Sequence, residues 1–221
     1  GALAFTNPSG GDTQHFLQAN VLATVSAQTL LLYDRIFEVN KTMNSTATEA
    51  VTGVPSRYQS STPANEDYSG DNFLFVQVGG TALAATAHNW TTCTYTDQDG
   101  NTGVTLPSLT GNSGAIVDRL DHPTGQWFAP LASGDSGIKA LTQMQCSAAV
   151  ATGVVWFMIG HPLGFMTFPQ ANGLLPFDWL TNRDQAPRVF DNACVAFMEP
   201  LKPATTATNY TGRLVATSTS S

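Results

Sequence analysis

The apolar residues of the segment 13–43 recur with the spacing of an α-helix. The segment, TQHFLQANVLATVSAQTLLLYDRIFEVNKTM, contains neither Gly nor Pro. Intervals of three, four and seven residues place side chains on one stripe of a helix. The pattern predicts a long helix over 13–43, capped by Asp12 or Thr13, with a break near 24–29 where Thr and Val lower helix propensity. The stripe consists of Leu17, Val21, Val25, Leu32, Ile36, Val39 and Met43.

A second helix is expected over 138–151, IKALTQMQCSAAVA, which is rich in residues that favour helices. Asp135 or Ser136 stands immediately before it, where a short polar side chain can accept a hydrogen bond from the first free amides of a helix. The segment 134–137 therefore predicts a helix start at about residue 137.

Strands are indicated by short apolar or alternating runs separated by turn residues. Asp and Gly in 97–101, DQDGN, favour a hairpin between two of these runs. The run GVVWFMIG at 153–160 is almost continuously apolar, which is typical of a strand buried on both faces. The expected strands are 72–80, 81–96, 103–108, 126–131 and 153–160, and 192–200 is expected to be a buried strand or a short helix.

Polar segments with Gly and Pro set the expected domain organisation. We expect an extended N-terminal arm at 1–12, a single domain at 13–204 with a long irregular excursion at 44–72, and a C-terminal arm or tail at 205–221. The fold class is α+β, with the long N-terminal helix and the second helix packed on a mixed, largely antiparallel sheet.

Charge is scarce in this chain, and this changes the expected function. Charged residues make up 11% of the sequence, against about 25% in an average soluble protein. Because the cores of protein interfaces are depleted in charge, the composition favours a chain that buries surface against neighbours. A neutral, hydroxyl-rich secreted protein is the alternative. The net charge is −7 and the nine Lys and Arg are scattered, so we expect neither sequence-specific nucleic-acid binding nor attachment to an anionic membrane.

One short motif suggests catalysis. Gly134-Asp135-Ser136-Gly137 resembles the nucleophile segment of chymotrypsin-like serine proteases, and ATAHNW places His88 in a setting loosely like that of their general base. A serine nucleophile needs a base within hydrogen-bond reach and a third group that orients the base. The helix-forming residues after Gly137 and the 48 residues between His88 and Ser136 argue against the protease architecture. A helix cap is the preferred interpretation of the motif.

Metal and cofactor sites are not expected. The three cysteines, Cys93, Cys146 and Cys194, are about fifty residues apart and form no C-x-x-C pair. They are interpreted as three buried free thiols, or as one disulfide and a free thiol. His88 and Cys93 would lie on opposite faces of a strand, and DRLDH at 118–122 is interpreted as a salt-bridged turn before a proline. The sequence has no P-loop or Rossmann fingerprint. We therefore predict no catalytic, cofactor-binding or metal-binding residue.

Several phrases together resemble virion structural proteins encoded in the head-gene regions of tailed bacteriophages. They are LYDRIFEVNKTMNSTATEAVTGVPSRYQS, NFLFVQVGGTALAATAHNWTTCTYTDQDGNT, LPSLTGNSG, RLDHPTGQWFAPL and FMIGHPL, within residues 30–204. The resemblance implies a non-enzymatic capsid subunit that assembles with copies of itself and other head proteins into an icosahedral shell. It implies a virion location after assembly in the host cytoplasm. It transfers no functional residue.

An HK97-like capsid fold, with an N-terminal arm, an extended loop and a spine helix, is one fold that the resemblance implies. The chain departs from that order because no extended hairpin precedes 13–43, and 221 residues is short for such proteins. The departure keeps open a capsid decoration or cement protein, or a tail or connector component. The alternatives from other classes are a serine hydrolase using Ser136 and an extracellular β-rich binding module.

Overall fold

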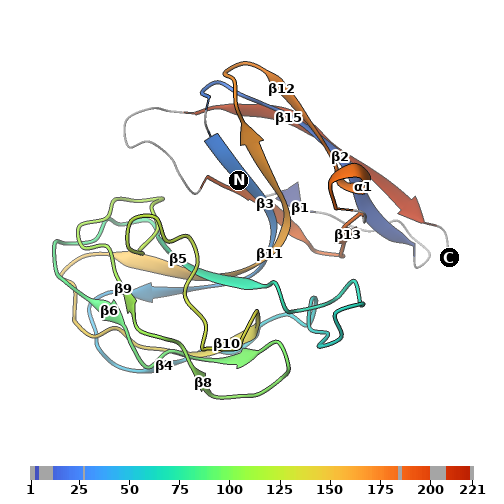
Figure 1. Cartoon of the computed structure of the whole chain (residues 1–221). Helices are drawn as coiled ribbons and strands as arrows, with labels where there is room; N and C mark the ends of the chain where they lie inside the picture. Colours follow the sequence, from blue (N-terminus) through green and yellow to red (C-terminus); the bar gives the residue numbers. More distant parts are fainter. Residues whose placement is uncertain (1–2, 5–11, 27, 184–185, 200–207, 220–221) are drawn as a thin grey trace. The chain divides into compact units, whose positions relative to one another are not determined.

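The chain folds almost entirely into β-strands. The computed structural model describes residues 3–4, 12–26, 28–183, 186–199 and 208–219 (Figure 1). Strands account for 47% of the model and helix for 2%. The chain divides into two compact units. The terminal unit comprises Gly1–Asp34 and Pro162–Ser221, and the central unit comprises Arg35–His161.

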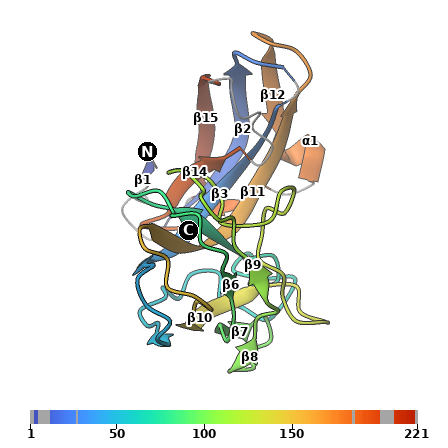
Figure 2. The same ribbon diagram turned by 90° about the vertical axis from the view of Figure 1, so that its left-hand side faces the viewer.

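The first sheet of the terminal unit is built around one strand, β2. β15 pairs with β2 along its whole length, whereas β12 and β13 pair with shorter parts of it, all antiparallel. Figure 2 shows β15, β2 and β12 side by side. The strands are β2 (Thr13–Ala23), β12 (Leu174–Asp178), β13 (Arg188–Val189) and β15 (Tyr210–Thr219).

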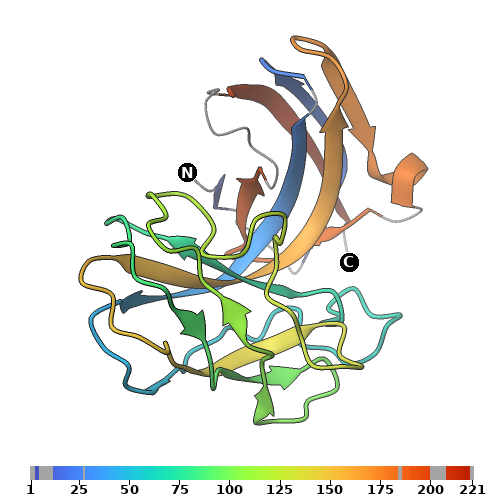
Figure 3. The same cartoon turned by 60° about the vertical axis from the view of Figure 1, so that its left-hand side comes forward.

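The second sheet of the terminal unit contains two long strands that continue into the central unit. β3 and β11 run side by side, blue and orange in Figure 3. Residues 30–34 of β3 are all buried, as expected for a strand covered on both faces. The strands in sheet order are β1 (Leu3–Ala4), β14 (Cys194–Met198), β3 (Gln28–Thr42) and β11 (Val154–Phe168).

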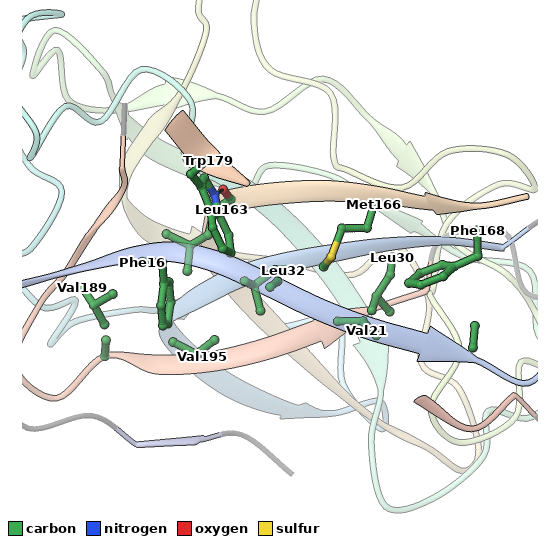
Figure 4. Packing of buried hydrophobic residues seen from close by; sticks show 13 residues of the cluster. Phe16, Val21, Leu30, Leu32, Leu163, Met166, Phe168, Trp179, Val189 and Val195 are labelled. Atoms are coloured by element: carbon green, nitrogen blue, oxygen red, sulfur yellow. Dashed lines mark hydrogen bonds between the residues drawn. The ribbon is translucent and has the colours of Figure 1, made fainter. Parts of the chain in front are cut away.

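The core of the terminal unit lies between these two sheets (Figure 4). Phe16 and Val21 of β2 face Leu32 of β3, and the fully buried Trp179 closes one end. Trp179 begins the helix α1 (Trp179–Arg183). Its ring stacks on Phe16 at 5.6 Å between centroids, and its indole N–H donates to the Leu163 carbonyl at 2.6 Å. A large aromatic ring is therefore buried without an unpaired polar atom.

The central unit contains a second set of strands. β5 (Phe73–Val78) pairs with residues 155–160 of β11. Trp90 is buried and packs edge-on against Phe157 of β11 at 4.6 Å. A four-stranded sheet has the order β4 (Glu49–Ala50), β10 (Ile138–Met144), β7 (Thr94–Asp97) and β8 (Val104–Thr105), and β6 (Asn89–Trp90) pairs with β9 (Leu109–Thr110).

The long helix predicted over 13–43 is wrong, because these residues form β2 and β3. The spacing of four, as from Val21 to Val25 and from Leu32 to Ile36, is misleading because residues four apart share one face of a strand as well as of a helix. A β-bulge adds a second interval that fits a helix. Between Val215 and Ala216 of β15 the register skips from Gln18 to Phe16 of β2, so Leu17 is an extra residue. The buried positions therefore run from Phe16 to Ala19, which is a helical interval, before alternation resumes.

The helix predicted over 138–151 is also wrong. Residues 138–144 form β10, and two register shifts against β7 place its buried residues, Ile138, Leu141 and Met144, three apart. The α+β class and the HK97-like spine helix are therefore corrected to an all-β fold of several antiparallel sheets. In the described part of the chain, no helix is long and apolar enough to span a membrane.

Several strand predictions are confirmed. β5 lies in 72–80, β11 covers 153–160 and β14 lies in 192–200. β7 and β8 form the predicted hairpin around 97–101. The excursion at 44–72 contains only β4 and one isolated bridge, whereas 126–131 forms no strand. The predicted N-terminal arm, 1–12, falls largely outside the described residues.

Candidate functional site

The most concentrated group of buried polar side chains surrounds Asp121 in the central unit. The Asp121 carboxylate accepts three hydrogen bonds from separate parts of the chain. The His88 Nε2 donates at 2.9 Å, the Trp90 indole at 2.7 Å and the Asn112 backbone amide at 2.7 Å. Asp121, His88 and Trp90 are each at most 3% exposed. We call His88, Trp90, Asn112, Asp121 and His122 the Asp121 cluster.

Local backbone geometry brings these residues together. The chain before Pro123 runs along β5, where the Asp121 amide donates to the Val76 carbonyl at 2.8 Å. The Val76 amide in turn donates to the His122 Nε2 at 2.9 Å. A Cβ atom on Gly111 would lie 2.1 Å from the His88 Nε2. Only glycine therefore leaves room for the imidazole beside the carboxylate.

His88 has two acceptors for its two ring nitrogens. Its Nδ1 lies 3.0 Å from the Thr86 carbonyl, and its Nε2 faces the Asp121 carboxylate. Burial alone lowers the pKa of His88, but the hydrogen bonds to Asp121 and Thr86 outweigh burial and raise the pKa above its ordinary value. The geometry therefore suits an imidazolium that donates from both nitrogens.

His122 has the opposite character. Burial lowers the pKa of His122 to about 4, despite the nearby Asp121 charge. Its Nε2 accepts the Val76 amide, which requires that nitrogen to be unprotonated and leaves the ring proton of the neutral form on Nδ1. Asp121 thus lies beside one histidine whose pKa is raised, His88, and one whose pKa is lowered, His122.

The hydrogen bonds of the Asp121 cluster hold separate segments of the central unit together. A general base needs a ring nitrogen within reach of the proton that it removes. Both nitrogens of His88 are engaged, and the cluster is buried away from water. A fully connected buried network of this kind rigidifies a core.

The segment 134–137 forms a turn before β10 rather than a helix start. Gly134 has a φ of 100°, and a Cβ on Gly137 would lie 2.1 Å from the Ser69 carbonyl, so each glycine is required by the backbone. The amides of Ser136 and Gly137 both donate to the Gln98 Oε1, at 3.1 and 3.3 Å. Asp135 accepts from the Tyr95 hydroxyl at 2.5 Å. Burial raises the pKa of that tyrosine, and the hydrogen bond to Asp135 raises it further.

Ser136 does not begin a helix, because residues 138–144 form β10. The expected helix therefore does not exclude Ser136 as a nucleophile. Instead, the imidazole of His88 is bonded to Asp121 and Thr86, whereas Ser136 is anchored through its amide to Gln98. The residue that resembled a general base and the residue that resembled a nucleophile do not form a pair.

The remaining candidates have structural roles. Asp97 closes the β7–β8 turn by accepting from the amides of Asp99 and Asn101, and these bonds lower its pKa against the effect of burial. Cys93, Cys146 and Cys194 are thiols rather than members of disulfides, and burial raises the pKa of Cys93 to about 11. Across the described ranges, no three His, Cys, Asp or Glu residues come together as metal ligands.

No feature of the sequence predicts that His88 and Asp121 lie together. The segment 118–122 predicts a salt-bridged turn, whereas Asp121 pairs with His88, which lies outside that segment. The two residues are 33 positions apart and belong to separate irregular segments. The sequence places Gly111, Asp121 and His122 in one polar stretch, but this placement does not indicate that His88 is the partner of Asp121.

Each of the two units also exposes large apolar side chains. Six large apolar side chains in the described residues are at least 39% exposed. The terminal unit contributes four of them, and the central unit contributes two. They are Ile116, Val117, Phe165, Leu174, Leu180 and Phe197.

Comparison with known proteins found no match. No protein-family model, no curated protein and no solved structure matches this chain.

Proposed function

We propose that this chain is a structural protein of a virus particle, a capsid subunit that assembles with copies of itself. The observation that carries the proposal is the surface chemistry. Only 11% of the residues are charged, and six large apolar side chains are exposed in the described part of the chain. A surface of this kind favours burial against neighbouring subunits over a dispersed monomer.

The resemblance to virion proteins of tailed bacteriophages supports the same proposal. The acidic net charge of −7 suits a shell that is filled by a packaging motor, because such a shell needs no basic arm to collect the genome. The Asp121 cluster supports a rigid subunit, since the Asp121 carboxylate joins β6 to two loops, and the Asp121 amide and the His122 ring bond to β5.

A decoration or cement protein is the second candidate. It is favoured by the all-β fold, because the described residues contain no long helix to serve as the spine of a shell subunit. Such a protein binds a shell that other subunits have built. It would remain a monomer in isolation and bind only to assembled heads.

The oligomeric state of the purified chain tests the proposal. We expect size-exclusion chromatography with light scattering to show species larger than one chain, growing with protein concentration, and negative-stain microscopy to show regular assemblies. A monomer at every concentration that also fails to sediment with phage heads would contradict both candidates. A monomer that sediments with heads would select the decoration role.

A fluorophosphonate probe tests the hydrolase alternative. We expect no labelling of Ser136, because the imidazole of His88 is engaged by Asp121 and Thr86. The Ser136 side chain is exposed, so Ser136→Ala should change the free energy of unfolding by less than about 0.5 kcal/mol. Stoichiometric labelling that Ser136→Ala abolishes would overturn the structural proposal.

A further inference from the structure

The outer edge of β15 is open in the described structure. β15 pairs with β2 over its ten residues on one side only. On its other side no strand is present among the residues that the structure describes, and Figure 2 shows it outermost in its sheet. Alternate residues of such a strand direct their N–H and C=O groups away from the sheet, where they can pair with another strand.

The usual protections of an edge strand are weak or missing in β15. Natural edge strands are kept short, carry charges or prolines, or contain bulges. β15 has ten residues, seven of them exposed, no proline and one charged residue, Arg213. The bulge in this part of the sheet lies in β2, at Leu17, so β15 itself is regular.

We propose that β15 pairs antiparallel with β15 of a second copy of this chain, which joins two terminal units into one continuous sheet. The inference rests on the proposed function and names the surface through which subunits associate. The composition of the strand favours its own copy as the partner. It has no acidic residue to attract a basic strand, and its Thr and Val side chains form favourable pairs with one another.

Symmetry and charge together select the register. A two-fold axis perpendicular to the sheet places one residue directly opposite its own copy. If the two-fold axis passed beside Arg213, two like charges would lie opposite each other, which is unfavourable. Centring on Val215 pairs Arg213 with Thr217 and separates the two arginines by about 13 Å along the strand.

The same register keeps the core intact. Tyr210 and Leu214 pack against the core of the terminal unit, so the odd-numbered residues of β15 lie on the opposite face. On that face, Val215 meets its own copy and Thr211 meets Thr219. These are contacts between β-branched side chains, which are among the favourable cross-strand pairs.

Disulfide trapping in the full chain tests this pairing. In Val215→Cys, the two introduced thiols would be directly opposite, with Cβ atoms about 4.5–5.5 Å apart, close to the separation that a disulfide spans. We expect copper-phenanthroline oxidation to give a dimer on non-reducing gels. Thr211→Cys is the matched control on the same face, because its two copies would be roughly 26 Å apart and should give no dimer. Wild-type protein sets the background from the native cysteines.

A second variant measures the effect on assembly. Val215→Lys would place two ammonium groups at the two-fold axis, and we expect a several-fold loss of dimer in size-exclusion chromatography. Equal trapping of Thr211→Cys, or assembly of wild type without trapping of Val215→Cys and without an effect of Val215→Lys, would overturn the β15 pairing and leave the proposed function standing. A wild-type chain that neither self-associates nor binds heads contradicts the proposed function itself.

Discussion

Asp121→Asn is expected to lower the free energy of unfolding by about 3–5 kcal/mol, because it leaves a buried charge without its partner. The Asp121 carboxylate accepts from His88, Trp90 and the Asn112 amide, and it is fully buried. An asparagine keeps the shape but presents an NH₂ group where one of these donors needs an acceptor. The measurement is chemical denaturation followed by tryptophan fluorescence and circular dichroism.

Asp118→Asn is the matched control for this substitution. Asp118 lies three residues earlier and is exposed. Its carboxylate accepts one long hydrogen bond, from the Gln77 side-chain amide at 3.4 Å. Its φ of 66° suits asparagine as well as aspartate. We expect a change below about 0.5 kcal/mol. Equal losses for the two variants would contradict the role assigned to the Asp121 cluster.

The same comparison has a spectroscopic readout. The bond to Asp121 is one of the interactions that raise the pKa of His88. In Asp121→Asn that pKa should fall, because burial then acts with only the Thr86 carbonyl against it. An NMR titration of the imidazole resonances would detect the change, whereas Asp118→Asn should leave the His88 resonances unchanged.

Strands were predictable where alternation is regular and were missed where bulges interrupt it. The β7–β8 hairpin follows from Asp-Gly turn chemistry, and the buried part of β11 follows from a continuous apolar run. In β2 and β10, bulges change the interval between buried residues from two to three. Over 13–43, apolar residues four apart fit one face of a strand as well as of a helix, and the absence of Gly and Pro favours the helix. Over 138–151, the helix-favouring composition is overridden by the pairing with β7.

The break expected near 24–29 coincides with the connection between β2 and β3. Residues 24–26 are a bend between β2 and β3. Thr24, Val25 and Thr29 lower helix propensity, and β-branched residues of this kind favour strands. These residues therefore favour two strands over one broken helix. The Asp121 cluster could not have been found in this way, because long-range packing alone brings its members together.

Acidification is expected to destabilise the chain through His122. Its pKa in the folded state is about 4, below the value of about 6.5 in an unfolded chain. As the pH falls, the unfolded chain therefore binds the proton first. The contribution to stability is complete above about pH 6.5 and is lost as the pH falls toward 4, by about 3 kcal/mol. Protonation of the Nε2 would also remove the acceptor of the Val76 amide.

His122→Gln isolates this effect, because the Gln carbonyl can accept the Val76 amide and does not titrate. The difference in unfolding free energy between wild type and His122→Gln should change by about 3 kcal/mol between pH 7 and pH 4, measured by urea denaturation at each pH. A difference that is independent of pH would contradict the structural assignment of a neutral, buried imidazole.

His88→Gln supplies a control of opposite sign. Because the folded-state pKa of His88 is raised, its contribution to stability is complete below about pH 6.5 and is lost as the pH rises through the folded-state value. Removing His88 should therefore change the pH dependence above about pH 6.5, and removing His122 should change it below that pH. Since both histidines lie beside Asp121, two separate pH ranges would show that hydrogen-bond partners and burial, rather than proximity to that carboxylate, determine which of them is charged.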